Sequence, residues 1–466
     1  MSQSQPNILL FLTDDHGAWA LGANNNREIR SPLLDSLARE GANFRNAFTP
    51  CPVCSPARAC LLTGRTPSQV GIHDWLGEHE QDIAERDWLE GEITLPELLH
   101  DAGYHCGLSG KWHLGRSHYV PRGFDWCFGL PGGQGDHRSP YVYHLNGQSL
   151  PRHANKTQLI TDYALQFLEQ APSDKPFFLN VGYITTHSPY AQQEEELLAL
   201  YEDATFEDIP LYKAHPWHKN EGLSNGEHDR ETLRSHYANY YAAVSEIDRN
   251  VGRILEQLRQ SGCLENTLVI YVSDHGCALG HHGFWGKGNS TRPLNMHETS
   301  LRVPLLMRWP GRIQPGTIIE HCVDHYDLFQ FICSAAGATL PQRAYPGSDF
   351  SGLLQNPDAA WDDVHFGEYG DLRMIRTPHY KLVRRYPNGP DDLFDLGADP
   401  DETRNLALLP EYAETHAALL QRLEEWYAVY EEPSKSGLRV KELPRHNAGA
   451  EAWRDGLREA RGLQVY

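Results

Sequence analysis

Short apolar runs of the kind that form buried β-strands alternate with helix-like segments along most of this 466-residue chain. The strand-like runs are at residues 8–13, 105–109, 177–184, 268–273 and 303–308. The helix-like segments are at residues 32–39, 95–102, 158–170 and 231–260. Because alternating strands and helices are typical of βαβ units, the pattern predicts an α/β domain built on a large, mostly parallel sheet flanked by helices.

The pattern changes after about residue 362. Two antiparallel strands and one amphipathic helix are expected at residues 372–385, 392–396 and 411–430. We therefore divide the chain into a catalytic α/β domain, residues 1–362, and a smaller C-terminal α+β subdomain, residues 363–466. The polar tail from Glu431 has few apolar side chains and is expected to be loosely packed. An arm over the catalytic pocket and a contact between subunits are the alternatives.

The composition of the chain limits the possible binding partners and the cellular compartment. The chain has 41 Lys+Arg against 62 Asp+Glu, and its net charge of −21 repels nucleic acids and anionic membranes. No run approaches the ~20 apolar residues that cross a bilayer. The first residues carry no basic side chain, and the nine cysteines are odd in number and scattered. We therefore expect a cytoplasmic protein without a secretory leader and leave its oligomeric state open.

Residues 54–65 read Cys-Ser-Pro-Ala-Arg-Ala-Cys-Leu-Leu-Thr-Gly-Arg. This segment resembles the signature of the type I, formylglycine-dependent sulfatases, which belong to the alkaline phosphatase superfamily. The resemblance implies an alkaline-phosphatase-like fold and a Cys54 that a formylglycine-generating maturation enzyme oxidises to Cα-formylglycine. The hydrated aldehyde, a geminal diol, is then the nucleophile. Cys54 is also predicted to open a helix, whose N-terminus favours an anion such as sulfate.

Two acidic pairs, Asp14-Asp15 and Asp274-His275, each follow a strand-like run. Functional groups gather at the carboxyl ends of strands in an open α/β sheet, so these pairs can meet there. By resemblance, one divalent cation is bound by five residues, namely Asp14, Asp15, Cys54 in its modified form, Asp274 and His275. An oxygen-rich site favours Ca²⁺. The imidazole of His275, where many sulfatases have asparagine, leaves Mn²⁺ open.

Sulfate-ester cleavage needs a nucleophile at sulfur, positive charge around the sulfuryl oxygens and a proton for the leaving alkoxide. Three further motifs resemble those of the family. They are Gly-Lys-Trp-His-Leu-Gly at residues 110–115, Thr-His-Ser-Pro at residues 186–189 and Gly-Lys-Gly at residues 286–288.

The resemblance implies a role for each charged residue of these motifs. Arg58 and Lys111 would contact the formylglycine and the oxygens around the metal. His187 and Lys287 would grip the sulfate, and one of them would protonate the leaving oxygen. In the implied cycle one diol oxygen attacks sulfur and the alcohol departs. His113 then deprotonates the remaining hydroxyl, sulfate is expelled and the aldehyde returns.

Three loops combine aromatic side chains with Asp, Gln and His, a composition that suits a sugar ring but also ordinary loop packing. The candidate substrate contacts are His73, Asp74, Trp75, Gln134, His137, Arg138, His282 and Trp285. They favour a carbohydrate sulfate ester over a simple aryl sulfate. The net charge of −21 favours a small substrate over a long, densely sulfated polymer.

Other functions stay open. An arylsulfatase, or a phosphonate or phosphodiester hydrolase of the same superfamily, would share the metal pairs and could share formylglycine. A binding protein that kept the fold and lost the chemistry is the alternative of another class. It is disfavoured because every expected catalytic group is present.

Overall fold

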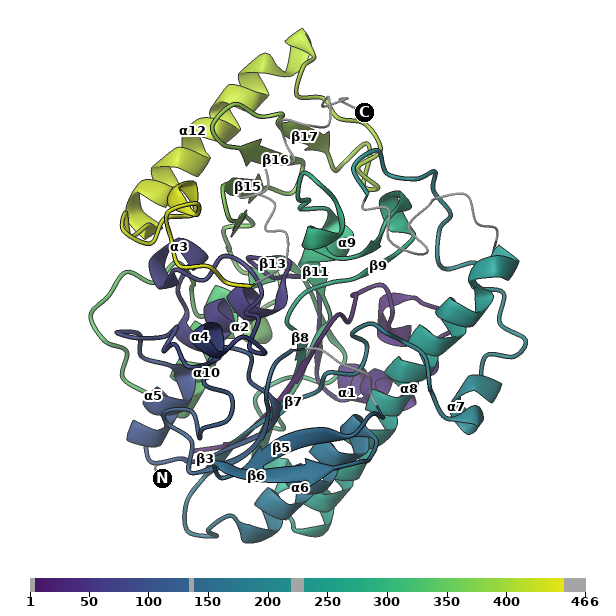
Figure 1. The fold of residues 1–466 in the computed structure, drawn as a ribbon, viewed down its shortest axis with the longest axis vertical. Coiled ribbons are helices and arrows are strands. Elements are labelled where there is room, and N and C mark those ends of the chain that lie inside the picture. The colour runs from purple at the N-terminus through teal and green to yellow at the C-terminus, as the bar shows by residue number, and fades with distance from the viewer. Residues whose placement is uncertain (1–4, 134–137, 219–229, 448–466) are drawn as a thin grey trace.

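A computed structural model describes residues 5–133, 138–218 and 230–447 (Figure 1). Within these residues eleven strands form one large sheet. Its centre consists of neighbouring parallel strands, in the order β8 (Thr267–Ser273), β1 (Asn7–Thr13), β7 (Phe177–Gly182), β3 (His105–Lys111) and β4 (Trp126–Leu130). The expected α/β fold with a large, mostly parallel sheet is therefore confirmed.

The two edges of the sheet contain antiparallel pairs. One edge carries β12 (Leu305–Arg308), β2 (Ala42–Phe48), β11 (Arg302–Val303) and β13 (Thr317–Asp324). The other edge is the hairpin of β5 (Tyr141–Leu145) and β6 (Gln148–Arg152). The strand expected at residues 303–308 is divided between β11 and β12. Pro304, which lacks the N–H needed for a sheet ladder, lies between them.

Helices cover both faces of the sheet (Figure 1). One face packs against α2 (Cys54–Thr63), α5 (Leu95–Asp101) and α10 (His325–Ala336), and the other against α1 (Pro32–Glu40), α6 (Lys156–Gln170) and α8 (Arg230–Gln260). Successive side chains of β1 enter the two cores alternately, since Leu10 and Leu12 join one core and Leu9 and Phe11 the other. None of the described helices combines the length and apolarity that a membrane span requires.

Shorter elements lie in the connections. They are α3 (Pro67–Val70), α4 (Gln81–Ala84), α7 (Glu195–Ala199), α9 (Glu298–Leu301), α11 (Ser351–Gln355) and the small ribbon of β9 (Ala278–Leu279) and β10 (Trp285–Gly286).

The C-terminal region forms a second, antiparallel sheet. Its strands are β14 (His365–Tyr369), β15 (Leu372–Arg376), β16 (Tyr380–Arg385) and β17 (Asp392–Asp395), and α12 (Ala413–Tyr430) packs on them. The strand expected at residues 372–385 is two strands, because a turn containing Pro378 joins Thr377 N to Tyr380 O at 2.8 Å. The division of the chain at residue 362 remains a proposal.

The tail after α12 is not loosely packed over its described part. Residues 431–447 lie against the segment around α3, where the N–H groups of Glu432 and Gly437 donate to Ser68 O at 3.1 Å and Ser68 Oγ at 2.9 Å. Val440 is buried. The expectation was wrong because hydrogen bonds, rather than a run of apolar side chains, hold this segment.

Candidate active site

The two acidic pairs lie side by side at the carboxyl ends of β1 and β8. These strands are parallel neighbours, and their register pairs Thr13 with Ser273. The residues that follow, Asp14 and Asp274, are both fully buried. The structure therefore brings together two pairs that are far apart in the sequence, through the topology of the sheet.

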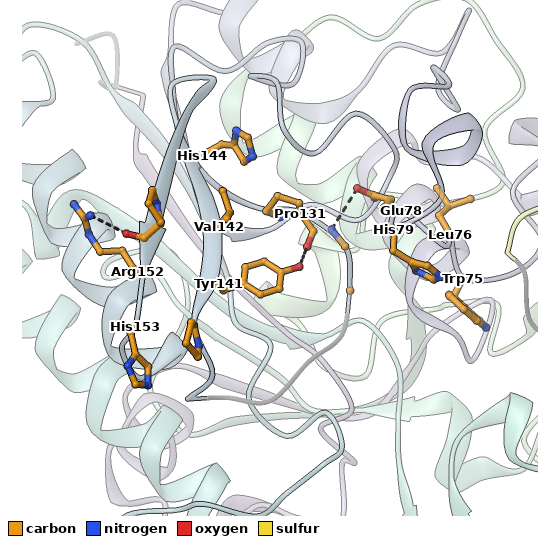
Figure 2. Close-up of a pocket in the computed structure, with 14 residues that line it drawn as sticks. Trp75, Leu76, Glu78, His79, Pro131, Tyr141, Val142, His144, Arg152 and His153 are labelled. Carbon is orange, nitrogen blue, oxygen red and sulfur yellow. Dashed lines mark hydrogen bonds between the residues drawn. The ribbon is translucent and has the colours of Figure 1, made fainter.

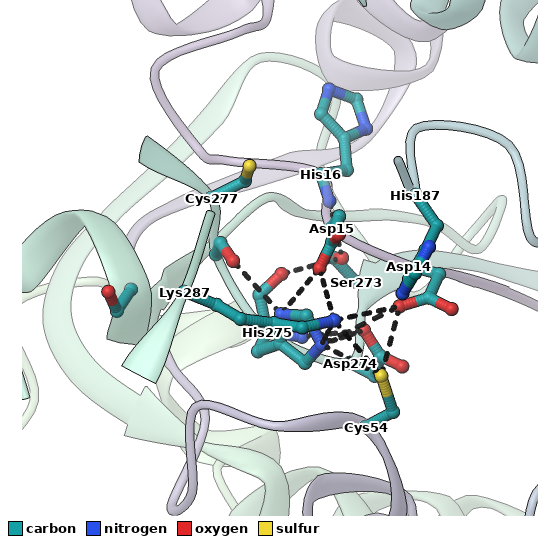
Figure 3. A network of polar contacts seen from close by, with 12 residues as sticks. Asp14, Asp15, His16, Cys54, His187, Ser273, Asp274, His275, Cys277 and Lys287 are labelled. Carbon is teal, nitrogen blue, oxygen red and sulfur yellow. Dashed lines mark hydrogen bonds and ion pairs between the residues drawn. The ribbon is translucent and has the colours of Figure 1, made fainter. Parts of the chain in front are cut away.

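Cys54 lies beside these pairs at the first residue of α2 (Figure 3). Its Sγ is 3.4 Å from Asp14 Oδ1 and 3.4 Å from His275 Nε2. Asp14, Cys54, Asp274 and His275 each offer a ligand atom within 4.8 Å of the others, and Asp14 and Asp15 form an overlapping group with His187. All the residues predicted to bind the cation thus converge on one buried point.

The donor set fits a divalent cation. Three buried carboxylates repel one another, and burial followed by the charge of Asp14 raises the pKa of Asp274 to about 6. His275 Nδ1 donates to Gly276 O at 2.9 Å and lies 3.2 Å from Asp15 Oδ1. Its Nε2 faces Asp14, Cys54 and Asp274 and is the ring nitrogen free to bind a cation among them. A positive ion at this point would relieve the repulsion between the carboxylates.

Three buried cations pair with the carboxylates beside Cys54. Lys111 Nζ pairs with Asp14 and donates to Gly133 O at 3.0 Å. Arg58 Nε donates to Asp274 Oδ2 at 2.9 Å. Lys287 Nζ is 2.8 Å from Asp15 Oδ1 and 3.1 Å from Cys54 Sγ.

These cations create a strongly positive environment at residue 54. Burial alone would raise the pKa of the Cys54 thiol, but Lys111 and Lys287, with smaller contributions from His275 and His113, lower it well below its usual range. The same positive charge would stabilise an anionic nucleophile and the oxygens of a bound sulfuryl group.

His113 and His187 approach Cys54 from different segments. His113 Nε2 donates to Leu76 O at 2.9 Å, whereas Nδ1 has no conventional hydrogen-bond partner among the described residues. His187 follows β7 and points toward Asp14 (Figure 3). Burial and the charge of Lys287 lower the pKa of His187, but the combined effect of Asp15, Asp14 and Cys54 is larger and raises it above its ordinary value.

A cavity of about 860 Å³ lies beside the side chains of Lys111 and His113. Leu76 and Gly133, whose carbonyls accept hydrogen bonds from these side chains, are part of its wall. The other lining side chains are mostly aromatic, histidine or charged, and include Trp75, Glu78, His79, Tyr141, His144, Arg152 and His153 (Figure 2). This cavity is the candidate substrate pocket.

Of the residues predicted to contact substrate, Trp75 lines this pocket. Gln134 and His137 lie outside the described residues. His73 and Asp74 do not line the pocket, because both are buried under the C-terminal tail and hydrogen-bonded to it. Arg138 donates to Gln192 O at 2.5 Å, so its described contact is with the neighbouring loop.

His282 and Trp285 belong to other clusters. Trp285 stacks on Tyr237, and His282 stacks on His297 with ring centroids 4.1 Å apart and planes 13° apart. His282, His297 and Glu402 lie close enough to bind a metal. We infer no metal ion at this cluster. The two near-parallel rings direct their nitrogen lone pairs side by side rather than toward one point, and a buried ion pair with Lys381 already neutralises Glu402.

Two of the three loops expected at the pocket, residues 71–77 and 132–141, do supply part of its wall, including Trp75, Gly133 and Tyr141. Sequence reasoning missed the rest of the wall, most of which comes from residues 142–153, and the main-chain contacts of the site. No sequence signal marks Leu76 O, because the hydrogen bond to His113 uses a backbone group that every residue has.

The fold and the buried cluster of candidate cation ligands are those of an alkaline-phosphatase-like hydrolase. Residues 6–338 match the sequence model of the sulfatase family, and residues 280–428 match that of the C-terminal region of N-sulphoglucosamine sulphohydrolase. The chain therefore belongs to the sulfatase family, whose named members hydrolyse sulfate esters.

Three similar proteins illustrate the range of the family. The chain is 32% identical to human N-acetylgalactosamine-6-sulfatase over 80% of this chain and 70% of that protein. It is 30% identical to an ulvan-active sulfatase of Formosa agariphila, over 91% of this chain and 82% of that one. A solved structure in complex with its substrate D-glucosamine-2-N,6-O-disulfate superposes with a TM-score of 0.76 at 25% identity, covering 92% of this chain and 98% of that one.

Proposed function

We propose that this protein hydrolyses the sulfate ester of a small carbohydrate, using Cα-formylglycine made from Cys54 and one divalent cation. The observation that carries the proposal is the position of Cys54. Its Sγ lies 3.4 Å from both Asp14 Oδ1 and His275 Nε2 and 3.1 Å from Lys287 Nζ. A nucleophile made from this side chain would start beside the cation ligands and within a positive environment.

The cation would be held by Asp14, Asp15, Asp274 and His275, with the modified residue 54 as a further ligand. It supplies positive charge that stabilises the nucleophile and the sulfuryl oxygens. The carboxylate oxygens favour Ca²⁺ as the ion, and the His275 imidazole keeps Mn²⁺ as the alternative.

Lysine and histidine side chains of the chain would stabilise negative charge and transfer protons. Formylglycine supplies the nucleophilic hydroxyl and, through its second hydroxyl, a route for releasing sulfate. Lys111 and Lys287 are placed to hold negative charge at residue 54. His113 Nδ1 is the candidate base. His187, whose pKa lies above its ordinary value, is the candidate proton donor to the leaving oxygen.

The pocket supports a sugar as the group that carries the sulfate. Trp75 and Tyr141 provide apolar ring faces, and Glu78, His79 and Arg152 provide polar groups for hydroxyls. Its lining combines one arginine and one glutamate with three histidines, which supply hydrogen-bond donors and acceptors for hydroxyls and sulfate oxygens. The similarity to an N-acetylgalactosamine-6-sulfatase and to an ulvan-active sulfatase also supports a carbohydrate substrate. So does the similarity to a solved structure whose substrate is D-glucosamine-2-N,6-O-disulfate.

The proposal also implies a maturation partner and a compartment. A formylglycine-generating enzyme must act on Cys54 before the protein is active. We further propose a cytoplasmic location, on the basis of nine cysteines that are all free thiols in the structure.

The test compares matured parent protein with a Cys54→Ala variant. We expect the tryptic peptide containing residue 54 to show the lower mass of the aldehyde, and the parent alone to release sulfate from sulfated monosaccharides. Turnover by Cys54→Ala would contradict the mechanism. A higher kcat/KM for a phosphonate monoester than for any sulfate ester would instead favour the phosphonate hydrolase alternative.

A further inference from the structure

The described C-terminal tail reaches the active site through a single short segment, residues 75–77. We propose that the tail residues His446 and Asn447 are positioning residues, which hold this segment where Leu76 orients His113. The inference rests on the proposed function, because it takes His113 as the base of the reaction. It assigns a role in the catalytic site to two residues of the C-terminal tail.

The tail binds the residues on both sides of Leu76. Asn447 Nδ2 donates to Trp75 O at 2.9 Å, and Gly77 N donates to His446 O at 2.8 Å. His446 and Asn447 are both buried, so water has little access to replace these bonds. Residues 75 and 77 are thus fixed by the tail, and both polar backbone groups of Leu76 contact the active site, although the carbonyl also accepts from Glu78 N at 3.0 Å.

The N–H and the carbonyl of Leu76 contact two different residues of the active site. Its N–H donates to the hydroxyl of Ser55, the residue next to Cys54, at 3.0 Å. Its carbonyl accepts from His113 Nε2 at 2.9 Å. Because a carbonyl can only accept, Nε2 carries the proton and Nδ1 keeps its lone pair. Leu76 O therefore selects the tautomer in which Nδ1 can act as a base.

The tail itself is anchored by a buried polar network. His73 N donates to His446 Nε2 at 3.0 Å, and His73 Nε2 donates to Lys435 O at 2.8 Å. Asp74 accepts from Asn447 at 3.3 Å and from the hydroxyl of Tyr369, at the end of β14, at 2.6 Å. His73 and Asp74 thereby connect the C-terminal subdomain to the wall of the pocket.

The experiment uses the matured, cation-loaded full chain carrying Asn447→Ala. Losing the donor to Trp75 O frees residues 75–77, and a misplacement of about 1 Å at a catalytic group can lower the rate roughly 10²-fold. We expect kcat to fall by that order with little change in KM. Because His113 acts in sulfate release, the first turnover should stay fast and give a burst of one alcohol per active site.

A second measurement does not depend on activity. Hydrogen–deuterium exchange of the peptide containing residues 73–79 should rise in Asn447→Ala, also in protein with unmodified Cys54. Glu442→Gln is the matched control, because Glu442 is an exposed tail residue whose ion pair is with Arg439. Asn447→Leu, which is close to asparagine in size, cannot donate and adds no charge beside Asp74, should resemble Asn447→Ala and serves if the alanine variant fails to fold.

The outcomes separate this inference from the proposed function. Parental kcat and parental exchange in both Asn447 variants would overturn the positioning role. Equal losses of kcat and of burst amplitude would also overturn it, since they indicate general damage rather than a slower second step. Full turnover by His113→Ala would refute the role of His113 as base, whatever the exchange data show.

Discussion

Replacing Lys111 with methionine tests whether the buried ion pair with Asp14 holds the cation site together. Both side chains are fully buried, and Lys111 Nζ also donates to Gly133 O at 3.0 Å. Methionine has a similar length and volume, so the variant removes charge without opening a cavity. The protein with unmodified Cys54 is suitable, because the measurement is of stability and not of turnover.

The expected cost follows from what remains around Asp14. Removing one partner of a buried ion pair usually costs about 3–5 kcal/mol, because the other charge is left uncompensated. Lys287 Nζ stays 3.9 Å from Asp14 Oδ1. At an effective dielectric constant of about 20 that separation corresponds to an attraction of about 4 kcal/mol. We therefore expect a loss at the lower end of the range, about 3 kcal/mol.

The assay is urea denaturation with EGTA and with excess Ca²⁺. A ligand present at about 100 times its Kd adds about 2.7 kcal/mol of stability. Ca²⁺ should raise the free energy of unfolding of the variant more than that of the parent, because the ammonium group that repels the ion is gone. Ca²⁺ should therefore reduce the difference in stability between the two proteins. Lys435→Met is the control. Its partner Glu92 keeps ion pairs with Arg65 and Arg343. The free energy of unfolding of Lys435→Met should therefore fall by less than about 1 kcal/mol.

Two results would refute this reasoning. Equal stability of Lys111→Met and parent in EGTA would mean that the pair does not stabilise the fold. An unchanged difference in excess Ca²⁺ would mean that Ca²⁺ does not bind near Asp14.

Two further variants test the roles proposed for His113 and His187. A Cβ at Gly133 would lie 2.1 Å from His113 Cε1, so Gly133→Ala should lower kcat roughly 10²-fold. Gly352→Ala, which meets nothing within 4 Å, should not lower it, and equal activity of the two variants would contradict the placement of His113. Burial and Lys287 lower the pKa of His187, but Asp15, Asp14 and Cys54 together raise it above its ordinary value. A proton donor loses activity as the pH rises through its pKa. The kcat/KM profile should therefore fall on its alkaline side in the parent, and a similar alkaline fall in His187→Gln would remove His187 from that role.

The sequence by itself determined the central strands and the meeting of the acidic pairs. Residues 8–13 and 268–273 are short apolar runs with an acidic residue directly after each. Parallel neighbours end at one edge of the sheet, so two local patterns and one topological rule were enough. The place of Cys54 at the start of a helix was likewise local, because the signature motif itself forms the first turns of α2.

Only the tertiary structure decided how the catalytic groups are oriented and what encloses the substrate pocket. Leu76 O, Gly133 O and the donors of Asn447 act through backbone contacts or across hundreds of residues, and neither leaves a periodic pattern in the sequence. The tail was expected to be loose because it has few apolar side chains, yet buried hydrogen bonds fix it. Hydropathy records the side chains a segment can bury, whereas polar contacts depend on which partner the fold places opposite them.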